Sequence, residues 1–395
     1  MEQYTKPCPS CGAEQMLSFY RVTPVPIHSV LLHTTREEAI QLPSGEIDLG
    51  YCEACGFISN MAFEPEVMRY SGRYESTQAY SPTFNRFQKQ LGESLIERYD
   101  LRHKRLLEIG CGQGEFLTFL CQQGPNTGIG FDPAYDAERA GQPQTEGLTF
   151  IADYYSEKYA DLESDFLFCK MTLEHIPNVA EFVGMVRRAI QNRPETVVFF
   201  QVPNAVYVFE DIAFWDIYYE HCSYFSPQSL ASLFQAQGFQ VLNLWTDYDD
   251  QYLMIEARPG KEGEAIPPLM GNLVSLPEAD VTWFSTEATN RQTKWHRKFT
   301  ERKEAGLSTV LWGGGSKAVS FLTTLGLSEE DIACAVDINP HKAGTYLAGT
   351  GHPVVQPATL VAHRPDVVII MNPIYRNEIQ AEITRMGLTP LILTV

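Results

Sequence analysis

Short apolar runs alternate with amphipathic stretches through the middle of the chain. Largely apolar runs at residues 148–151, 166–169 and 196–202 are typical of strands buried on both faces of a parallel sheet. Apolar residues recur at helical spacing over residues 84–99, and residues 227–237 also predict a helix. Runs at 241–245 and 251–257 then predict a strand pair at an antiparallel edge. The pattern therefore predicts a doubly wound α/β core.

A second unit of strands and helices follows toward the C-terminus. Residues 258–280 carry four prolines and three glycines, which predicts a linker with room for a short helix. Residues 281–305 predict a helix whose apolar face contains Phe284, Ala288, Trp295 and Phe299 and packs against the core. Apolar runs at 309–312, 332–336 and 367–370 predict strands of a second sheet, so this part is expected to be Rossmann-like.

The N-terminal part contains two C-x-x-C-G motifs, whose cysteines are Cys8, Cys11, Cys52 and Cys55. Four thiolates fill the coordination sphere of a tetrahedral zinc ion and leave no position for water, so the predicted metal is structural. The alternative is a set of reduced cysteines without metal. Between the motifs, residues 29–32 and 47–51 predict short strands with a turn at 42–46. The other five cysteines are interpreted as small apolar residues of the interior.

These patterns divide the 395 residues into parts. We expect a zinc-binding β module over residues 1–65, a central domain over 66–258, a linker over 259–280 and a C-terminal domain over 281–395. The net charge of −19, with no Lys or Arg cluster, argues against nucleic acid as a partner. No signal peptide or membrane span is visible, and we expect a cytoplasmic protein. The sequence does not indicate whether it is a monomer or a dimer.

The strand predicted before residue 110 runs into a glycine-rich turn, Glu108-Ile109-Gly110-Cys111-Gly112-Gln113-Gly114. A dinucleotide site spaces its glycines G-x-G-x-x-G to hold a pyrophosphate, whereas this turn reads G-x-G-x-G with a carboxylate ahead of it. A carboxylate repels pyrophosphate but suits S-adenosylmethionine, which is cationic and has no phosphate. Asp132 ends the next predicted strand, where a carboxylate can accept both ribose hydroxyls.

Together these features resemble the cofactor motif of class I methyltransferases. Candidate cofactor-binding residues are Glu108, Gly110, Cys111, Gly112, Gly114, Asp132, Asp153 and Lys170. An NAD-dependent oxidoreductase is one alternative, and a non-enzymatic zinc adaptor is another.

A polar segment, Asp216-Ile217-Tyr218-Tyr219-Glu220-His221-Cys222-Ser223-Tyr224-Phe225-Ser226, follows the strand at 196–202. Ligands of doubly wound sheets bind outside the carboxyl ends of strands, so His221 is placed to act as a general base. A structural histidine is the alternative.

Farther on, Gly313-Gly314-Gly315-Ser316-Lys317 forms a second glycine turn that suits an anion such as phosphate. A tight turn with a surface lysine is the alternative there.

The polar segment resembles the Y-H-E-H-x-S-Y-F-S stretch of bacterial deoxysugar C-methyltransferases, which methylate a nucleotide-linked keto sugar. Residues 74–77, 173–176 and 337–350 are similar to other motifs of that family, whose members combine a zinc domain, a central S-adenosylmethionine domain and a C-terminal Rossmann-like domain. The resemblance implies that His221 removes a proton beside a ketone, that Tyr218 and Glu220 orient it or hold the enolate oxygen, and that Tyr74 lines the pocket. An acceptor would contact Tyr219, Tyr224, Asn204, Lys317 and Asn372.

The chain departs from that family on the side of the acceptor. Tyr219 stands where a histidine is usual, Ala318 stands where a glycine is usual, and residues 371–378 match a late motif only loosely. These departures leave open a keto substrate other than a sugar, drawn from natural-product biosynthesis, and methylation at oxygen.

Overall fold

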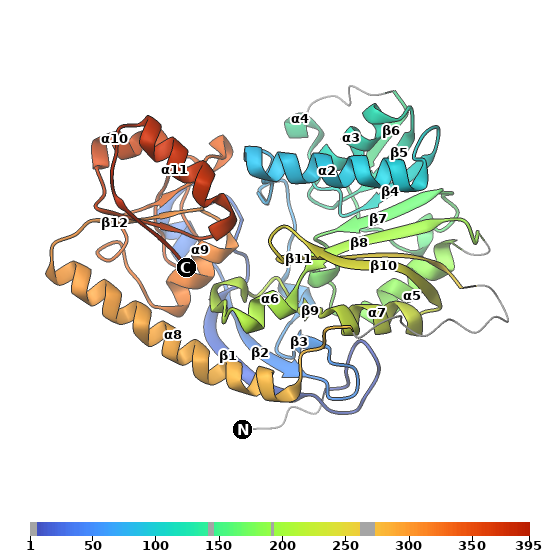
Figure 1. Cartoon of the computed structure of the whole chain (residues 1–395), viewed down its shortest axis with the longest axis horizontal. Coiled ribbons are helices and arrows are strands. Elements are labelled where there is room, and N and C mark those ends of the chain that lie inside the picture. Colours follow the sequence, from blue (N-terminus) through green and yellow to red (C-terminus); the bar gives the residue numbers. More distant parts are fainter. Residues whose placement is uncertain (1–5, 141–145, 191–192, 261–272) are drawn as a thin grey trace.

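The computed structural model describes residues 6–140, 146–190, 193–260 and 273–395. Its strands form three sheets, of four, seven and five strands (Figure 1). No helix of the described part combines the length and the apolarity that a membrane span requires.

The central sheet has the order β10-β11-β8-β7-β4-β5-β6. The five strands β4 to β8 are parallel, while β11 is antiparallel to β8 and β10 is antiparallel to β11, which confirms the predicted core and its antiparallel edge. The strands are β4 Arg105–Ile109, β5 Thr127–Phe131, β6 Leu148–Ile151, β7 Phe166–Lys170, β8 Val197–Pro203, β10 Phe239–Asp247 and β11 Tyr252–Pro259.

Helices cover both faces of the central sheet because successive side chains of its strands point to opposite faces. Phe199 of β8 packs in the cluster with α2 and α3, whereas its neighbours Val198 and Phe200 pack in the cluster with α5 and α7. The helical elements of this part are α2 Pro82–Tyr99, α3 Glu115–Gln123, α4 Ala137–Ala140, η2 Glu157–Tyr159, η3 Leu173–His175, α5 Val179–Ile190, α6 Ala205–Glu210, η4 Phe214–Asp216 and α7 Pro227–Ala236. The short elements α6 and η4 were not anticipated from the sequence.

The N-terminal sheet has the order β1-β2-β3-β9, in which β9 comes from the polar segment of the central part. The prediction of a strand at 29–32 is wrong: Leu31 makes only an isolated bridge with Tyr74, and the strand lies earlier, in β1. Residues 47–51 do fall in a strand. The elements are β1 Leu17–Pro26, α1 Arg36–Ile40, β2 Ser44–Tyr51, β3 Ile58–Asn60, η1 Pro65–Val67 and β9 Ser223–Tyr224.

The C-terminal sheet is parallel throughout, in the order β14-β13-β12-β15-β16. Its strands are β12 Thr309–Trp312, β13 Ala335–Val336, β14 Val354–Val355, β15 Val367–Ile370 and β16 Leu391–Thr394. Its helical elements are α8 Glu278–Glu304, α9 Ser316–Thr324, η5 Pro340–Lys342, η6 Pro357–Thr359, α10 Leu360–His363, η7 Pro373–Tyr375 and α11 Arg376–Arg385.

The long helix α8 leads from the N-terminal sheet to the C-terminal sheet along one side of the molecule (orange in Figure 1). Its predicted apolar face is confirmed, because Phe284, Ala288, Trp295 and Phe299 are all buried in one cluster with residues of β1 and α9. Most of the predicted linker, residues 261–272, lies outside the described residues, and so does any short helix there.

Candidate active site

One cavity of about 1070 Å³ opens between the three sheets. It is lined by the first glycine turn, by residues 74–81 ahead of α2, by the polar segment after α6, and by Trp312 and Lys317 at the second glycine turn. Segments that are far apart in the sequence therefore face one space.

The first glycine turn joins β4 to α3 with three glycines in the left-handed region. The φ angles are 73° at Gly110, 56° at Gly112 and 85° at Gly114. A Cβ at Gly110 would lie 1.9 Å from the Thr172 hydroxyl, and one at Gly114 would lie 2.4 Å from the Phe150 ring, so both positions are filled by packing. A Cβ at Gly112 would meet nothing closer than 4.0 Å. The turn is therefore open at Gly112, where the backbone borders the cavity.

Glu108 lies at the end of β4 and is 3% exposed, yet its Oε2 has no hydrogen-bond partner among the described residues. Burial raises the pKa of this carboxyl to about 8, and the charge of Lys170 opposes the shift. An unpaired buried carboxyl is costly unless a ligand completes it. The ammonium and hydroxyl groups of S-adenosylmethionine are suitable donors, so Glu108 and the open turn fit that molecule.

Lys170 also borders the cavity, at the end of β7. Its ammonium is hydrogen-bonded to the Gln88 side chain and lies 3.4 Å from the centre of the Phe116 ring. Burial lowers its pKa to about 8, against the charges of Glu108 and Glu115. The lysine thus has partners within the chain and interacts electrostatically with Glu108.

The carboxylate of Asp132, at the tip of β5, accepts hydrogen bonds from the backbone N–H of Gly112 (2.9 Å) and of Ala134 (2.7 Å). Burial raises its pKa. Asp153, after β6, also borders the cavity, but its carboxylate already pairs with Lys158 and accepts a hydrogen bond from Tyr159. Cys111 is buried in the turn, where its thiol lies 3.7 Å from the Gly112 carbonyl oxygen.

His221 is 7% exposed and reaches the same cavity from the segment after η4. Its Nε2 lies 2.9 Å from the Tyr218 hydroxyl, and the two rings are 4.1 Å apart at their centres. Burial lowers the pKa of His221 well below 6.5, and electrostatic repulsion from Lys317 and from the neighbouring His175 adds to this effect. At neutral pH His221 is therefore uncharged and able to take a proton.

Sequence reasoning did not select two residues of η3 that lie against His221. The His175 ring is 4.9 Å from the His221 ring, and Glu174 Oε1 is 4.0 Å from His221 Nε2. These three side chains form a cluster whose ligand-type atoms all lie within 4.8 Å. The signal was available in the Glu174-His175 pair directly after a strand end, a position that faces the ligand in doubly wound sheets.

Glu220 does not reach the cavity and lies behind its wall, in contact with the N-terminal part and with the side chain of Tyr74. Its carboxylate accepts hydrogen bonds from the backbone N–H (2.9 Å) and the hydroxyl of Ser29, and it lies 3.4 Å from His28 Nδ1. It anchors the segment and does not line the cavity. Tyr74 does line it, edge-on to the rings of His28 and Tyr70, and burial raises its pKa well above 10.

Two residues expected to contact an acceptor, Tyr219 and Asn204, do not line the cavity, contrary to that expectation. Tyr219 is buried against Phe63 in the N-terminal part, where its hydroxyl accepts a hydrogen bond from the Glu64 backbone N–H (2.9 Å). Asn204 caps α6, because its Oδ1 accepts from the Val206 N–H (3.1 Å). Tyr224 does line the cavity and is 4% exposed.

The second glycine turn joins β12 to α9 on the opposite side of the cavity. Lys317 borders the cavity, but its ammonium lies 2.6 Å from the Asp216 carboxylate, so it is already paired. Asn372 exchanges two hydrogen bonds with the Gln251 side chain, of 2.8 and 3.1 Å.

Asp337 repeats the arrangement seen at Asp132. It accepts hydrogen bonds from the backbone N–H groups of Gly314 (3.0 Å) and Asn339 (2.9 Å), and Lys342 lies 3.1 Å away. Asn339 borders the cavity and is 2% exposed. Its side-chain N–H₂ group has no hydrogen-bond partner among the described residues.

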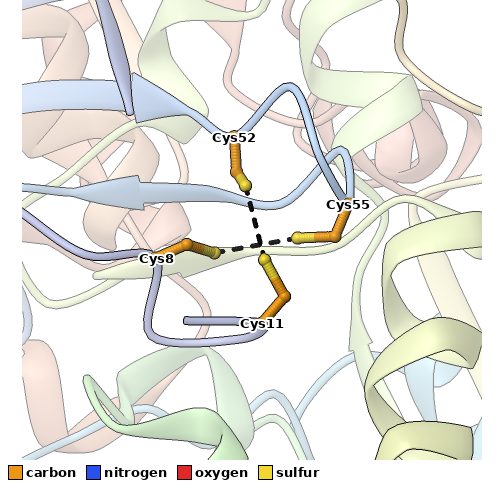
Figure 2. A group of neighbouring side chains, drawn as sticks. All are labelled: Cys8, Cys11, Cys52 and Cys55. Carbon is orange, nitrogen blue, oxygen red and sulfur yellow. Dashed lines mark hydrogen bonds between the residues drawn. The ribbon is translucent and has the colours of Figure 1, made fainter. Parts of the chain in front are cut away.

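The four N-terminal cysteines lie together at one point, between the loop before β1 and the loop after β2 (Figure 2). The Sγ atoms of Cys8 and Cys55 are 3.7 Å apart, and those of Cys11 and Cys52 are 3.6 Å apart. A tetrahedral zinc with Zn–S bonds of about 2.3 Å requires Sγ atoms about 3.8 Å apart. The donor set and its spacing therefore fit zinc. The remaining five cysteines are buried, as expected.

Comparison with known proteins agrees with this geometry. Residues 83–244 match the model of a methyltransferase domain, and residues 278–388 match that of a C-methyltransferase C-terminal domain. The C-methyltransferase NovU of Streptomyces niveus is 24% identical over 388 residues, which cover 94% of this chain and 90% of that protein.

Similar solved structures include a magnesium protoporphyrin IX methyltransferase from Synechocystis PCC 6803 (14% identity, TM-score 0.34, 45% of this chain and 80% of that one). Another is a 1,6-didemethyltoxoflavin-N1-methyltransferase from Burkholderia thailandensis (17% identity, TM-score 0.33, 44% and 78%).

The central part thus has the class I methyltransferase fold, and the protein is an S-adenosylmethionine-dependent methyltransferase. The oxidoreductase and adaptor alternatives are set aside, since the methyltransferase model covers the first glycine turn and the segment of His221 together.

Proposed function

We propose that this methyltransferase methylates the carbon beside the ketone of a nucleotide-linked keto-deoxysugar, with His221 as the base. The observation that carries the proposal is the single cavity, which joins the first glycine turn, His221 and the second glycine turn. Its volume of about 1070 Å³ suits two ligands, because small-molecule sites usually measure about 300–1,000 Å³. The match to a C-methyltransferase C-terminal domain and the similarity to NovU support carbon as the acceptor atom.

S-adenosylmethionine, when bound, supplies a methyl group activated by its sulfonium. The residues of the chain must therefore generate a carbon nucleophile and align it. The uncharged imidazole of His221 accepts the proton from the carbon beside the ketone, and the electron pair of that C–H bond remains on the acceptor as an enolate. Tyr218, hydrogen-bonded to His221 Nε2, orients the ring, and its hydroxyl is a donor for the enolate oxygen. Tyr74 and Tyr224 line the space for the acceptor.

For the nucleotide we propose the C-terminal face of the cavity. Asp337 offers a carboxylate and Asn339 an unpartnered amide N–H₂ group beside the second glycine turn. Polar groups of this kind suit ribose hydroxyls and a pyrimidine ring. Lys317 supplies a positive charge for the diphosphate, at the cost of its pairing with Asp216.

One observation favours a second candidate, a keto intermediate of natural-product biosynthesis that carries no nucleotide. The paired state of Lys317 leaves little free positive charge at the second glycine turn. A panel of acceptors that separates the two candidates contains ketones with and without a nucleotide diphosphate.

The test is methyl transfer from ¹³C-methyl-labelled S-adenosylmethionine to that panel, with NMR of the product. We expect a new methyl on carbon, seen only with nucleotide-linked ketones. His221→Gln should lower the rate by about 10²- to 10⁴-fold, the usual contribution of a general base. The matched control is His33→Gln, because His33 is also a buried histidine (2% exposed) and does not line the cavity. A methyl on oxygen, or full activity of His221→Gln, would contradict the proposal.

We also propose that the four cysteines hold a structural zinc ion. Metal analysis of the purified protein should give one zinc per chain, and Cys11→Ser should lose it. A protein that contains no zinc and keeps its stability after chelator treatment would exclude this role. The expected cytoplasmic location stays a prediction, as do the domain boundaries.

A further inference from the structure

Glu174 is a buried carboxyl group that no role yet explains. The side chain is 1% exposed, and neither of its carboxylate oxygens has a hydrogen-bond partner on another described residue. It also borders the cavity, at the carboxyl end of β7. Such a carboxyl group lowers the stability of the fold, because burial without partners disfavours its charged form. The nearest basic group is His221, whose Nε2 lies 4.0 Å from Glu174 Oε1.

The two nitrogens of the His221 ring have different surroundings. Nε2 lies 2.9 Å from the Tyr218 hydroxyl, within hydrogen-bond distance, and 4.0 Å from Glu174 Oε1, at ion-pair distance. Nδ1 makes no hydrogen bond among the described residues. A carboxylate beside one nitrogen of an imidazole favours the tautomer that carries its proton on that nitrogen, and it stabilises the imidazolium that forms. The arrangement leaves Nδ1 as the nitrogen that accepts the proton.

We propose that Glu174 is a positioning residue for His221: its carboxylate faces Nε2, keeps Nδ1 toward the acceptor, and stabilises the imidazolium that forms when Nδ1 takes a proton. The inference rests on the proposed role of His221 as the base. The proton moves from the carbon beside the ketone to Nδ1, the electron pair stays on the acceptor, and the charge of the imidazolium is balanced by Glu174. Glu174 itself touches neither reactant.

The alternative interpretation of this cluster is a metal site formed by Glu174, His175 and His221. It is disfavoured because the His175 ring is already hydrogen-bonded, to the Tyr70 hydroxyl (3.3 Å at Nδ1) and to the backbone of Glu220. Without His175 only two ligands remain, one of which is the proposed base. Positioning therefore explains the cluster with the contacts that are present.

The proposal predicts a pH dependence. Burial raises the pKa of Glu174 to about 8, so the carboxylate forms as the pH rises through that value and then raises the basicity of His221. The other titratable or charged groups around this pair come from several elements: His175 of η3, Cys169 of β7, Tyr218 and Cys222 of the polar segment, Tyr70 of the N-terminal part, Tyr252 of β11 and Lys317 of α9. Burial raises the pKa of these tyrosines and cysteines, so none of them is expected to ionise between pH 7 and 9.

The test compares Glu174→Gln with the wild type. In the wild type we expect kcat to rise between pH 7 and 9. In Glu174→Gln we expect that rise to be absent and kcat at pH 9 to be lower by about 10- to 100-fold, the effect of one to two pKa units at His221. The control is Glu256→Gln, which removes another fully buried carboxylate, one that is paired with Arg98 outside the cavity. This variant should melt at a lower temperature and keep the wild-type pH profile.

A second measurement does not need the acceptor. In protein labelled with ¹⁵N-histidine, the signals of His221, identified by their loss in His221→Gln, should shift near pH 8 in the wild type and not in Glu174→Gln. If no ketone is methylated but the change in the His221 signals near pH 8 is lost in Glu174→Gln, the proposed acceptor is wrong and the pairing of Glu174 with His221 stands. Identical His221 titrations in the two proteins would overturn the pairing. So would a second bound metal equivalent, beyond the cysteine site, that Glu174→Gln loses.

Discussion

Replacement of Gly112 by alanine separates the ligand-binding role of the first glycine turn from its role in folding. The residue has φ of 56°, and the left-handed conformation costs an L-residue about 1–2 kcal/mol. The added Cβ would meet no atom of the protein closer than 4.0 Å. We therefore expect Gly112→Ala to fold, with a free energy of unfolding lower by about 1–2 kcal/mol. The methyl group would occupy the side of the turn that borders the cavity, and S-adenosylhomocysteine should bind at least about tenfold more weakly, or about 1.4 kcal/mol.

The assay combines calorimetric titration with S-adenosylhomocysteine and urea unfolding. The control is Gly306→Ala, because Gly306 follows α8 with φ of 67°, has no atom within 4 Å of the added Cβ, and lies outside the cavity. It should lose a similar amount of stability and bind the ligand normally. Gly110→Ala is the opposite case: its Cβ would lie 1.9 Å from Thr172 Oγ1, so its loss of stability should be larger. If Gly112→Ala binds S-adenosylhomocysteine with wild-type affinity, the assignment of this turn as the donor cradle is refuted.

Three further outcomes are expected. Cys52→Ser should lower both the zinc content and the melting temperature, whereas Cys334→Ser, at a buried cysteine of the C-terminal part, should keep its zinc; metal analysis and calorimetry decide. In the folded protein the pKa values of Glu108 and Glu174 are about 8, against ordinary values near 4.5, so the stability that these carboxyl groups contribute is complete below pH 4.5 and is lost as the pH rises through 8. In urea unfolding, Glu108→Gln and Glu174→Gln should therefore gain stability relative to the wild type between pH 5 and pH 8. An equal difference in the free energy of unfolding at both pH values would contradict this. Asp216→Asn frees Lys317 from its 2.6 Å ion pair and should lower KM for a nucleotide-linked acceptor, while Lys317→Gln should raise it; an unchanged KM in both variants would show that the diphosphate lies elsewhere.

The parts of the fold that follow from local sequence were predictable. The strands of the central sheet are continuous apolar runs, and the glycine turn has three positive φ angles of the kind that glycine favours. The antiparallel edge could also be recognised, because two apolar runs follow the last helix of the core with a short connection. The strand at β1 was missed since its exposed positions interrupt the apolar pattern and Pro24 and Pro26 suggest a loop.

The parts of the site that depend on distant pairing were not predictable. The sequence does not show which of the four consecutive residues 218–221 face the cavity. In the structure Tyr218 and His221 reach it, while Tyr219 and Glu220 contact the N-terminal part. Which side each residue takes depends on contacts with Ser29 and Glu64, more than 150 positions away. Glu174 was overlooked for a different reason: its place after a strand end was a signal in the sequence, but its lack of hydrogen-bond partners can be seen only in the structure.

These distant contacts connect the N-terminal part to the segment that carries the proposed base. The cysteine cluster holds the loop between β2 and β3, and β3 pairs with β9 through Ile58 and Tyr224. Strand β9 begins two residues after His221, and Glu220 is held by Ser29 on the preceding side. The proposed base is thus flanked by two contacts with the N-terminal part, one of which, through β3, follows directly from the loop that the cysteines hold. Loss of the metal should therefore reduce methyl transfer even where the central sheet stays folded, because the ring of His221 would lose its orientation while the first glycine turn, built from β4 and α3, would still bind the donor.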